Sequence, residues 1–175
     1  MNRLSQAVVA ACASVVVLAL AGCGPSRSSE EPAPGAQQPQ GLAAVDPCTL
    51  LTPEELQSFG FEAPGEPDTG ISSEPGCRFN GRPFRATFSK NQEKTVDSYG
   101  RQKDTWAKYD RLEIDGRPAA SAIAEGSTQA RLCSALFDAG GGVIIITVSE
   151  FRDQGLDECA EGVKIAEAIA PRMPK

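Results

Sequence analysis

The chain has 175 residues, a formal net charge of −6, six cysteines and no histidine. An acidic chain without a long basic run is repelled by nucleic acids and by anionic membrane surfaces, so we expect neither as a ligand. The absence of histidine excludes Ser-His-Asp and Cys-His catalysis and removes imidazole as a metal ligand. Once the N-terminal segment is set aside, the length suits one domain of ordinary size.

Residues 1–22 have the pattern of a secretory signal peptide. Arg3 gives this segment a positive start, and residues 7–20 form an apolar core that is shorter than the roughly 20 residues of a membrane-spanning helix. The sequence Leu-Ala-Gly-Cys at 20–23 resembles the lipobox of bacterial lipoproteins, whose cysteine thiol receives a diacylglyceryl group and becomes the first residue after cleavage. We therefore predict that Cys23 is the lipid attachment site, and a plain secreted protein is the alternative.

Residues 23–44 comprise this cysteine and a predicted tether. The stretch combines prolines with serine and glutamine, and it has too few apolar residues to offset the entropy lost on ordering. We expect it to be disordered, with a single folded domain over residues 45–175.

The domain opens with a strong helix signal. Thr52 is a favourable N-cap, Pro53 suits the first helical position, and Glu55 completes a capping box. These residues predict a short helix from Pro53 to about Phe59. The proline- and glycine-rich stretch 62–76 that follows is predicted to be a surface loop.

Two predicted hairpins and a helix come next. Asn80-Gly81 predicts a tight turn, because both residues tolerate a positive φ, and the alternation that follows it predicts a strand with one buried face. Apolar residues at approximate helical spacing predict a helix over 95–108. Asp115-Gly116 predicts a second turn, between a strand that ends at Ile114 and one at 119–124.

The last part of the chain supplies the expected core. The almost entirely β-branched run Val143–Val148 predicts a central strand covered on both faces, paired with a strand over 130–137. Apolar residues at intervals of three and four between Leu156 and Ala170 predict a terminal amphipathic helix. The predicted fold class is α+β, an antiparallel sheet of about five to six strands with helices packed against it.

Four cysteines remain once Cys12, which leaves with the signal peptide, and Cys23, which carries the lipid, are set aside. An even number in an exported domain indicates structural disulfides, and four cysteines allow three pairings. We favour Cys48–Cys77 and Cys133–Cys159, since each pair joins a helical region to a strand and links neighbours in sequence. A thiolate zinc site and a thiol oxidoreductase are the alternatives, although closely spaced cysteine pairs are lacking.

A family resemblance rests on several of these features. Residues 46–56, an aromatic two residues after Cys77, the turn at 115–119, Cys133 and the pair Cys159-Ala160 resemble the domain-of-unknown-function 3558 family of actinobacterial envelope lipoproteins. The likeness covers residues 45–175, and Phe79 stands where the family often has tryptophan. It implies an envelope lipoprotein with two disulfides and an α+β fold, without an activity, cofactor or partner. A looser similarity, of fold only, is to Mog1/PsbP-like domains.

Residues able to carry chemistry are few. Asp110 and Glu113 have opposite parity on the predicted strand, so they do not face one substrate. The glycines at 140–142 lack the lysine and hydroxyl residue of a phosphate-binding loop. We therefore predict no catalytic, cofactor-binding or metal-binding residues.

One candidate recognition patch stands out. Trp106 and Tyr109, with Arg101 and Arg111 nearby, are suited to an anionic or carbohydrate partner. The alternative is a partly buried helix end with solvated charges.

These observations predict a membrane-anchored, extracytoplasmic lipoprotein whose domain is a non-enzymatic binding or accessory module of the cell envelope. It would contact the membrane through the lipid on Cys23 and bind an envelope protein or a small ligand. A carrier or sensor of a small apolar ligand, held in a cavity between sheet and helix, is the alternative. An enzyme without histidine is the third hypothesis.

Overall fold

The computed structural model describes residues 40–175, which form one antiparallel sheet of seven strands in the order β1-β2-β3-β7-β6-β5-β4. The strands are β1 (Glu66–Asp68), β2 (Gly76–Phe79), β3 (Phe84–Asn91), β4 (Trp106–Ile114), β5 (Arg117–Ala124), β6 (Leu132–Ala139) and β7 (Gly142–Glu150). The helices are α1 (Pro53–Ser58), α2 (Val96–Gly100) and α3 (Glu158–Ile169). The predicted α+β class is confirmed, with slightly more strands than expected.

Several predictions concern residues outside this range. The signal peptide (1–22), the lipid on Cys23 and the part of the tether before Gln40 lie outside the described residues.

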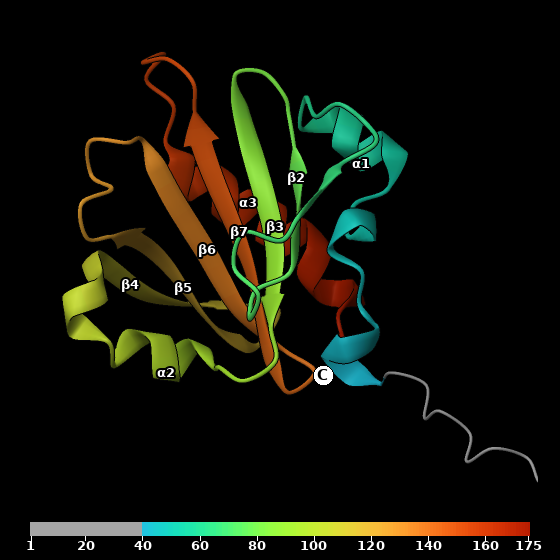
Figure 1. The fold of residues 1–175 in the computed structure, drawn as a ribbon, viewed down its shortest axis with the longest axis vertical. Coiled ribbons are helices and arrows are strands. Elements are labelled where there is room, and N and C mark those ends of the chain that lie inside the picture. Colours follow the sequence, from blue (N-terminus) through green and yellow to red (C-terminus); the bar gives the residue numbers. More distant parts are fainter. Residues whose placement is uncertain (1–39) are drawn as a thin grey trace, which may run out of the picture. The chain divides into compact units, whose positions relative to one another are not determined.

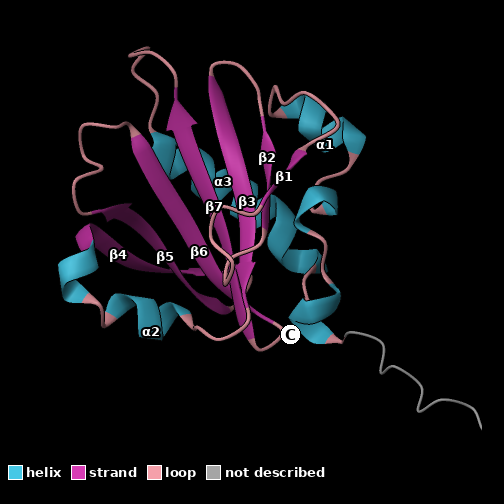
Figure 2. Ribbon diagram, in the orientation of Figure 1, coloured by secondary structure: helices cyan, strands magenta, loops and turns pink. Residues whose placement is uncertain are grey.

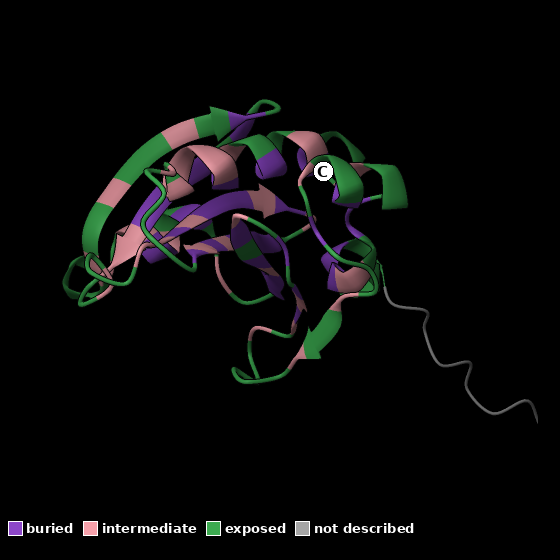
Figure 3. Ribbon diagram, turned by 90° about the horizontal axis from the view of Figure 1, so that it is seen from above, coloured by how far each residue is buried: buried purple, intermediate pink, exposed green. Residues whose placement is uncertain are grey.

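Helices cover both faces of the sheet (Figures 1 and 2). α3 packs on one face, where the register aligns Phe88, Ile146 and Ala135 as cross-strand partners. α2 packs on the other face, against a cluster that includes Leu136 and Ile145. The residues of α2 and α3 that face the sheet are buried, and those that face away from it are exposed or partly exposed (Figure 3).

β7 is the middle strand of the seven, as the β-branched run predicts. Ile144, Ile146 and Val148 belong to the cluster under α3, whereas Val143 and Ile145 belong to the cluster under α2. All five residues are buried, so this strand has an apolar layer on each side.

Two disulfides join the helical regions to the sheet. Cys48 is bonded to Cys77 in β2, and Cys133 in β6 is bonded to Cys159 in the first turn of α3. These are the pairs favoured from the sequence. The sulfur atoms of the four cysteines are thereby engaged in cross-links, which rules out a role as zinc ligands in this state.

The capping box at the start of α1 forms as predicted. Glu55 N donates to Thr52 Oγ1 (3.2 Å), and Thr52 N donates to Glu55 Oε2 (2.8 Å). The same carboxylate accepts two hydrogen bonds from Arg172, at 2.7 and 2.9 Å. This bidentate pair joins α1 to the segment after α3.

The domain starts earlier than predicted. Residues 41–44, assigned to the tether, form a 3₁₀ helix in which Leu42 is buried. Its backbone is held by the buried Lys90, whose Nζ donates to Leu42 O (3.2 Å) and Ala43 O (2.9 Å), and by Leu42 N, which donates to Gly140 O (3.3 Å). A distant lysine thus helps to order a segment that the composition of the whole stretch 23–44 assigns to the tether.

The helix predicted over 95–108 is largely wrong. α2 ends at Gly100, a 3₁₀ turn follows, and Trp106 begins β4. The apolar spacing arose because the short helix and the following strand both direct aromatic residues into one cluster.

The two predicted turns differ in outcome. Asp115 and Gly116 have φ values of 51° and 70°, as a two-residue turn between β4 and β5 requires. The β2–β3 connection is longer than a two-residue turn, since Phe79 pairs with Ala86, and neither Asn80 nor Gly81 has a positive φ. The loop predicted over 62–76 also contains the short edge strand β1.

The close approach of α3 to the sheet gives a stability test at Gly162. A Cβ there would lie 3.4 Å from Ala135 Cβ, which is an ordinary contact, so Gly162→Ala should leave stability within about 1 kcal/mol of the wild type or raise it. Gly162→Leu would overfill the interface and should lower the free energy of unfolding by about 1 to 3 kcal/mol. Urea denaturation of both variants measures the difference, and equal stabilities would contradict this packing.

Candidate functional site

The aromatic residues of the predicted patch pack between β4 and α2. The rings of Trp106 and Tyr109 have centroids 5.5 Å apart. Trp106 Nε1 donates to Tyr99 O (3.0 Å), and Tyr109 Oη donates to Val96 O (2.6 Å). Both side chains are partly buried and their polar ends bind backbone carbonyls of the helix.

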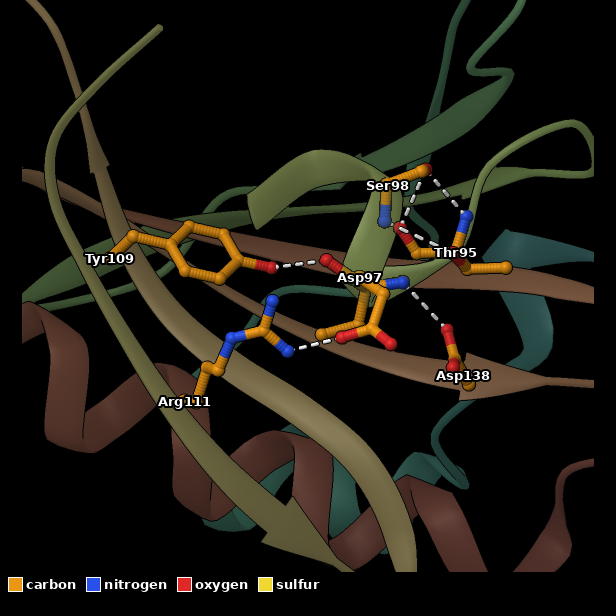
Figure 4. A network of polar contacts seen from close by, with 7 residues as sticks. Thr95, Asp97, Ser98, Tyr109, Arg111 and Asp138 are labelled. Atoms are coloured by element: carbon orange, nitrogen blue, oxygen red, sulfur yellow. Dashed lines mark hydrogen bonds and ion pairs between the residues drawn. The ribbon is translucent and has the colours of Figure 1, made fainter. Parts of the chain in front are cut away.

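The charged residues of the patch lie on the same side. Arg111 is hydrogen-bonded and ion-paired to Asp97 (Figure 4). Arg101 is exposed just after the last residue of α2. The structure therefore brings the patch together but uses three of its four side chains to attach α2, and recognition at this place stays a prediction.

The network in Figure 4 also fixes the start of α2. Thr95 and Ser98 form a capping box, and Val96 N donates to Asp138 Oδ1 (2.8 Å). Burial raises the pKa of Asp138, and the nearby Asp97 charge adds to this effect, whereas the hydrogen bond from Val96 opposes it. A five-residue helix is too short to be stable alone, so these contacts hold it in place.

A cleft of about 370 Å³ lies beside this network, next to the β4–β5 and β6–β7 turns. Its buried cation is Arg117, which donates to Ala170 O (3.1 Å), Met173 O (2.9 Å) and Pro174 O (2.6 Å). The guanidinium thus holds the segment after α3 and leaves little capacity for a ligand.

A second, larger cleft is the better candidate. We call it the arginine cleft; its volume is about 1190 Å³ and it is lined by Glu62, Asn80, Gly81, Arg82, Pro83, Phe151, Arg152, Asp153 and Gln154. One wall is the β2–β3 turn and the other is the loop from β7 to α3, at the end of the sheet away from the β6–β7 turn (Figure 1).

The first wall is fixed by backbone hydrogen bonds. Glu62 N donates to Asn80 O (2.8 Å), and Arg82 N donates to Gly60 O (3.2 Å). Between them Gly81 lies so close to its neighbours that a Cβ would be 2.6 Å from Gly60 O. Only glycine fits there, and the turn is thereby held beside the segment after α1.

The second wall is fixed by a buried carboxylate at the end of β7. The Glu150 side chain is fully buried; it accepts from Arg131 Nη1 (3.0 Å) and from Gln154 N (2.8 Å). Arg131 also pairs with Asp153 (2.6 Å). One arginine thus fixes both the last residue of the strand and the loop that carries Phe151 and Arg152.

The side chains that the cleft offers are an exposed ring and arginines. Phe151 is 55% exposed, and the Arg85 guanidinium lies 5.3 Å from its ring centroid. Arg82, Arg85 and Arg152 are exposed and form no ion pair with any residue of 40–175. This arrangement is suited to binding an anionic partner with an apolar part.

The arginine cleft was not predicted from the sequence. Its two walls come from segments about seventy residues apart, and neither contains a binding motif. The one local signal is Phe151-Arg152, an aromatic and a cation directly after the β-branched strand, which indicates that an apolar side chain is left outside the core.

The contribution of Arg131 to stability can be compared with that of an exposed ion pair. Arg131→Ala removes the partner of the buried Glu150 carboxylate and should lower the free energy of unfolding by about 2 to 4 kcal/mol. Lys164→Ala removes the exposed pair with Glu161 and should cost less than about 0.5 kcal/mol. If urea denaturation gave equal losses, Glu150 would not depend on Arg131.

The raised pKa of Asp138 predicts a pH dependence. A carboxyl group whose pKa in the folded state exceeds its ordinary value of 3.8 weakens the fold when it ionises. Asp138→Asn keeps an acceptor for Val96 N, so it should be the more stable protein at neutral pH, with an advantage that disappears as the pH falls below 3.8. Asp138→Ala, which lacks the acceptor, is the control. Thermal denaturation from neutral pH to below 3.8 measures the difference in stability between the variants and the wild type. A difference that does not change with pH would contradict the raised pKa of Asp138.

A membrane-spanning helix or a metal site would also bear on function. Within residues 40–175, no helix combines the length and hydropathy needed to cross a membrane, and no group of three acidic, cysteine or histidine side chains is arranged to hold a metal.

Comparison with known proteins gives a family and no function. No curated protein matches the chain, and neither does any solved structure. The family model described as a protein of unknown function, DUF3558, matches residues 7–172. The chain therefore belongs to the DUF3558 family.

Proposed function

We propose that the protein is a lipid-anchored, extracytoplasmic lipoprotein whose domain is a non-enzymatic binding module of the cell envelope. Cys23 carries the lipid, and the arginine cleft receives the ligand. The observation that carries the proposal is the position of this cleft, at the opposite end of the sheet from the 3₁₀ helix of residues 41–44 (Figure 1).

The geometry suits presentation away from a membrane. The 3₁₀ helix of residues 41–44 lies at the β6–β7 turn, where Leu42 N binds Gly140 O. β7 runs from this turn to the arginine cleft and has nine residues, which span roughly 27 to 30 Å. A domain attached through its N-terminal end would therefore hold the cleft on its far side.

The disulfides support export. Structural disulfides persist in oxidising compartments and are rare in the cytosol. Cys77 and Cys133 are buried, which protects both cross-links from reduction. The family match starts at residue 7, so the apolar N-terminal segment falls within the family pattern.

The packing favours surface binding over a carrier of a small apolar ligand. Such a carrier would use space between the sheet and α3, but Ile165 and Ala166 of the helix and Ala135 and Ile146 of the sheet are buried in one cluster. Because residue 162 is glycine, α3 lies so close to Ala135 of the sheet that only van der Waals contact distance remains between them.

The candidate acids for a histidine-free enzyme do not converge. Asp110 pairs across the strands with Ser121 and Glu113 with Pro118, so the two carboxyl groups project from opposite faces of β4. Asp110 is also ion-paired to Lys108 at 2.8 Å. This arrangement supports a binding role over acid–base catalysis.

Mass spectrometry of the mature N-terminus tests the anchoring. We expect a chain that begins at Cys23 and carries a diacylglyceryl group, because the thiol of the lipobox cysteine is the acceptor. Cys23→Ser should abolish the modification and release the protein from the membrane fraction, whereas Cys12→Ser, in the apolar core of the signal peptide, should leave both unchanged. An unmodified N-terminus at another residue would contradict the proposal.

A further inference from the structure

We infer that the arginine cleft binds an acidic segment of a partner protein, whose carboxylates meet Arg82 and Arg152 and whose apolar side chain packs on Phe151. This inference rests on the proposed function, since it names the class of partner that the displayed domain binds.

The arginines of the cleft lack the partners that other arginines have. In residues 40–175, only Arg82, Arg85, Arg101 and Arg152 among the arginines form no ion pair, and three of these four lie in or beside the cleft. A guanidinium group binds a carboxylate through two parallel N–H donors. In a chain with a net charge of −6, three neighbouring arginines that pair with no acid of residues 40–175 indicate carboxylates supplied by another molecule.

Phe151 adds an apolar contact at the same place. It is one of two large apolar side chains exposed among the described residues, and the other is Ile71. Arg85 lies over its ring and leaves more than half of the residue accessible. Phenylalanine and arginine are both enriched in the cores of protein–protein interfaces.

Both walls are in place before a partner arrives. The first is held through Gly81, which has no room for a side chain, and the second through the buried Glu150 and its partner Arg131. Because the backbone of both walls is already held, binding need not order it, which lowers the entropy cost of association.

The acidic groups of the cleft favour a peptide over an anionic polymer. Glu62 lines the cleft and forms no ion pair with a described residue. A polymer with a negative charge on every repeat would bring some of these charges against Glu62. A peptide can place its carboxylates at the arginines and a neutral or basic side chain at Glu62.

Fluorescence anisotropy on the full chain in detergent tests this assignment. The probes are short fluorescein-labelled peptides with two carboxylates at varied distances from a leucine, and the same peptides with asparagine and glutamine. We expect an acidic peptide to bind more tightly than its amide counterpart. Arg82→Gln with Arg152→Gln, and separately Phe151→Ser, should weaken this binding by about tenfold or more. The control Lys103→Gln, at another exposed cation that forms no ion pair with a described residue, should leave binding unchanged.

Several results would overturn the inference. These are equal affinities for acidic and amide peptides, an equal loss in Lys103→Gln, and arginine-dependent binding of poly(glycerol phosphate) or phosphatidylglycerol vesicles in preference to every acidic peptide. The peptide assay does not require the lipid on Cys23. Failure of peptide binding with an intact lipid anchor would therefore overturn only the partner, and peptide binding together with an unmodified native N-terminus would overturn only the anchoring.

Discussion

The burial of β7 on both faces is the constraint from which the rest of the architecture follows. The run Val143–Val148 is buried apart from the partly exposed Thr147, and its side chains alternate between two apolar clusters. A strand of this kind needs a layer on each side, because either face left open would expose β-branched side chains to water. The chain meets this need with two very different helices, α3 on one face and α2 on the other.

The two layers are stabilised by different means. α3 has twelve residues, buries Ile165 and Ile169, and is cross-linked to β6 through Cys133–Cys159. α2 has five residues and depends on polar contacts from other elements, namely Asp138 below its first residue and Tyr109 at Val96 O. The second layer is therefore sensitive to pH and to the loss of single polar groups, whereas the first depends on apolar burial and a covalent bond.

Features encoded within a few residues could be predicted from the sequence, and so could the two disulfides, whereas other contacts between distant residues could not. The capping box at Thr52, the turn at Asp115-Gly116 and the strand Val143–Val148 each depend on neighbouring residues. The ordering of residues 41–44 depends on Lys90, and the β2–β3 connection bends to meet the segment after α1 at Gly81. In both cases a tertiary contact overrides the local preference for disorder or for a tight turn.

The arginine cleft follows from the way β7 ends. The strand stays buried as far as Glu150, and a carboxylate at that depth requires a cation, which Arg131 supplies from the residue before β6. The same arginine binds Asp153, so the chain turns at once and Phe151 is left at the surface with Arg152 beside it. The length of β7 then separates this cleft from Leu42 at the β6–β7 turn. A single buried strand thus sets the two layers of the core and the distance between the arginine cleft and the 3₁₀ helix of residues 41–44.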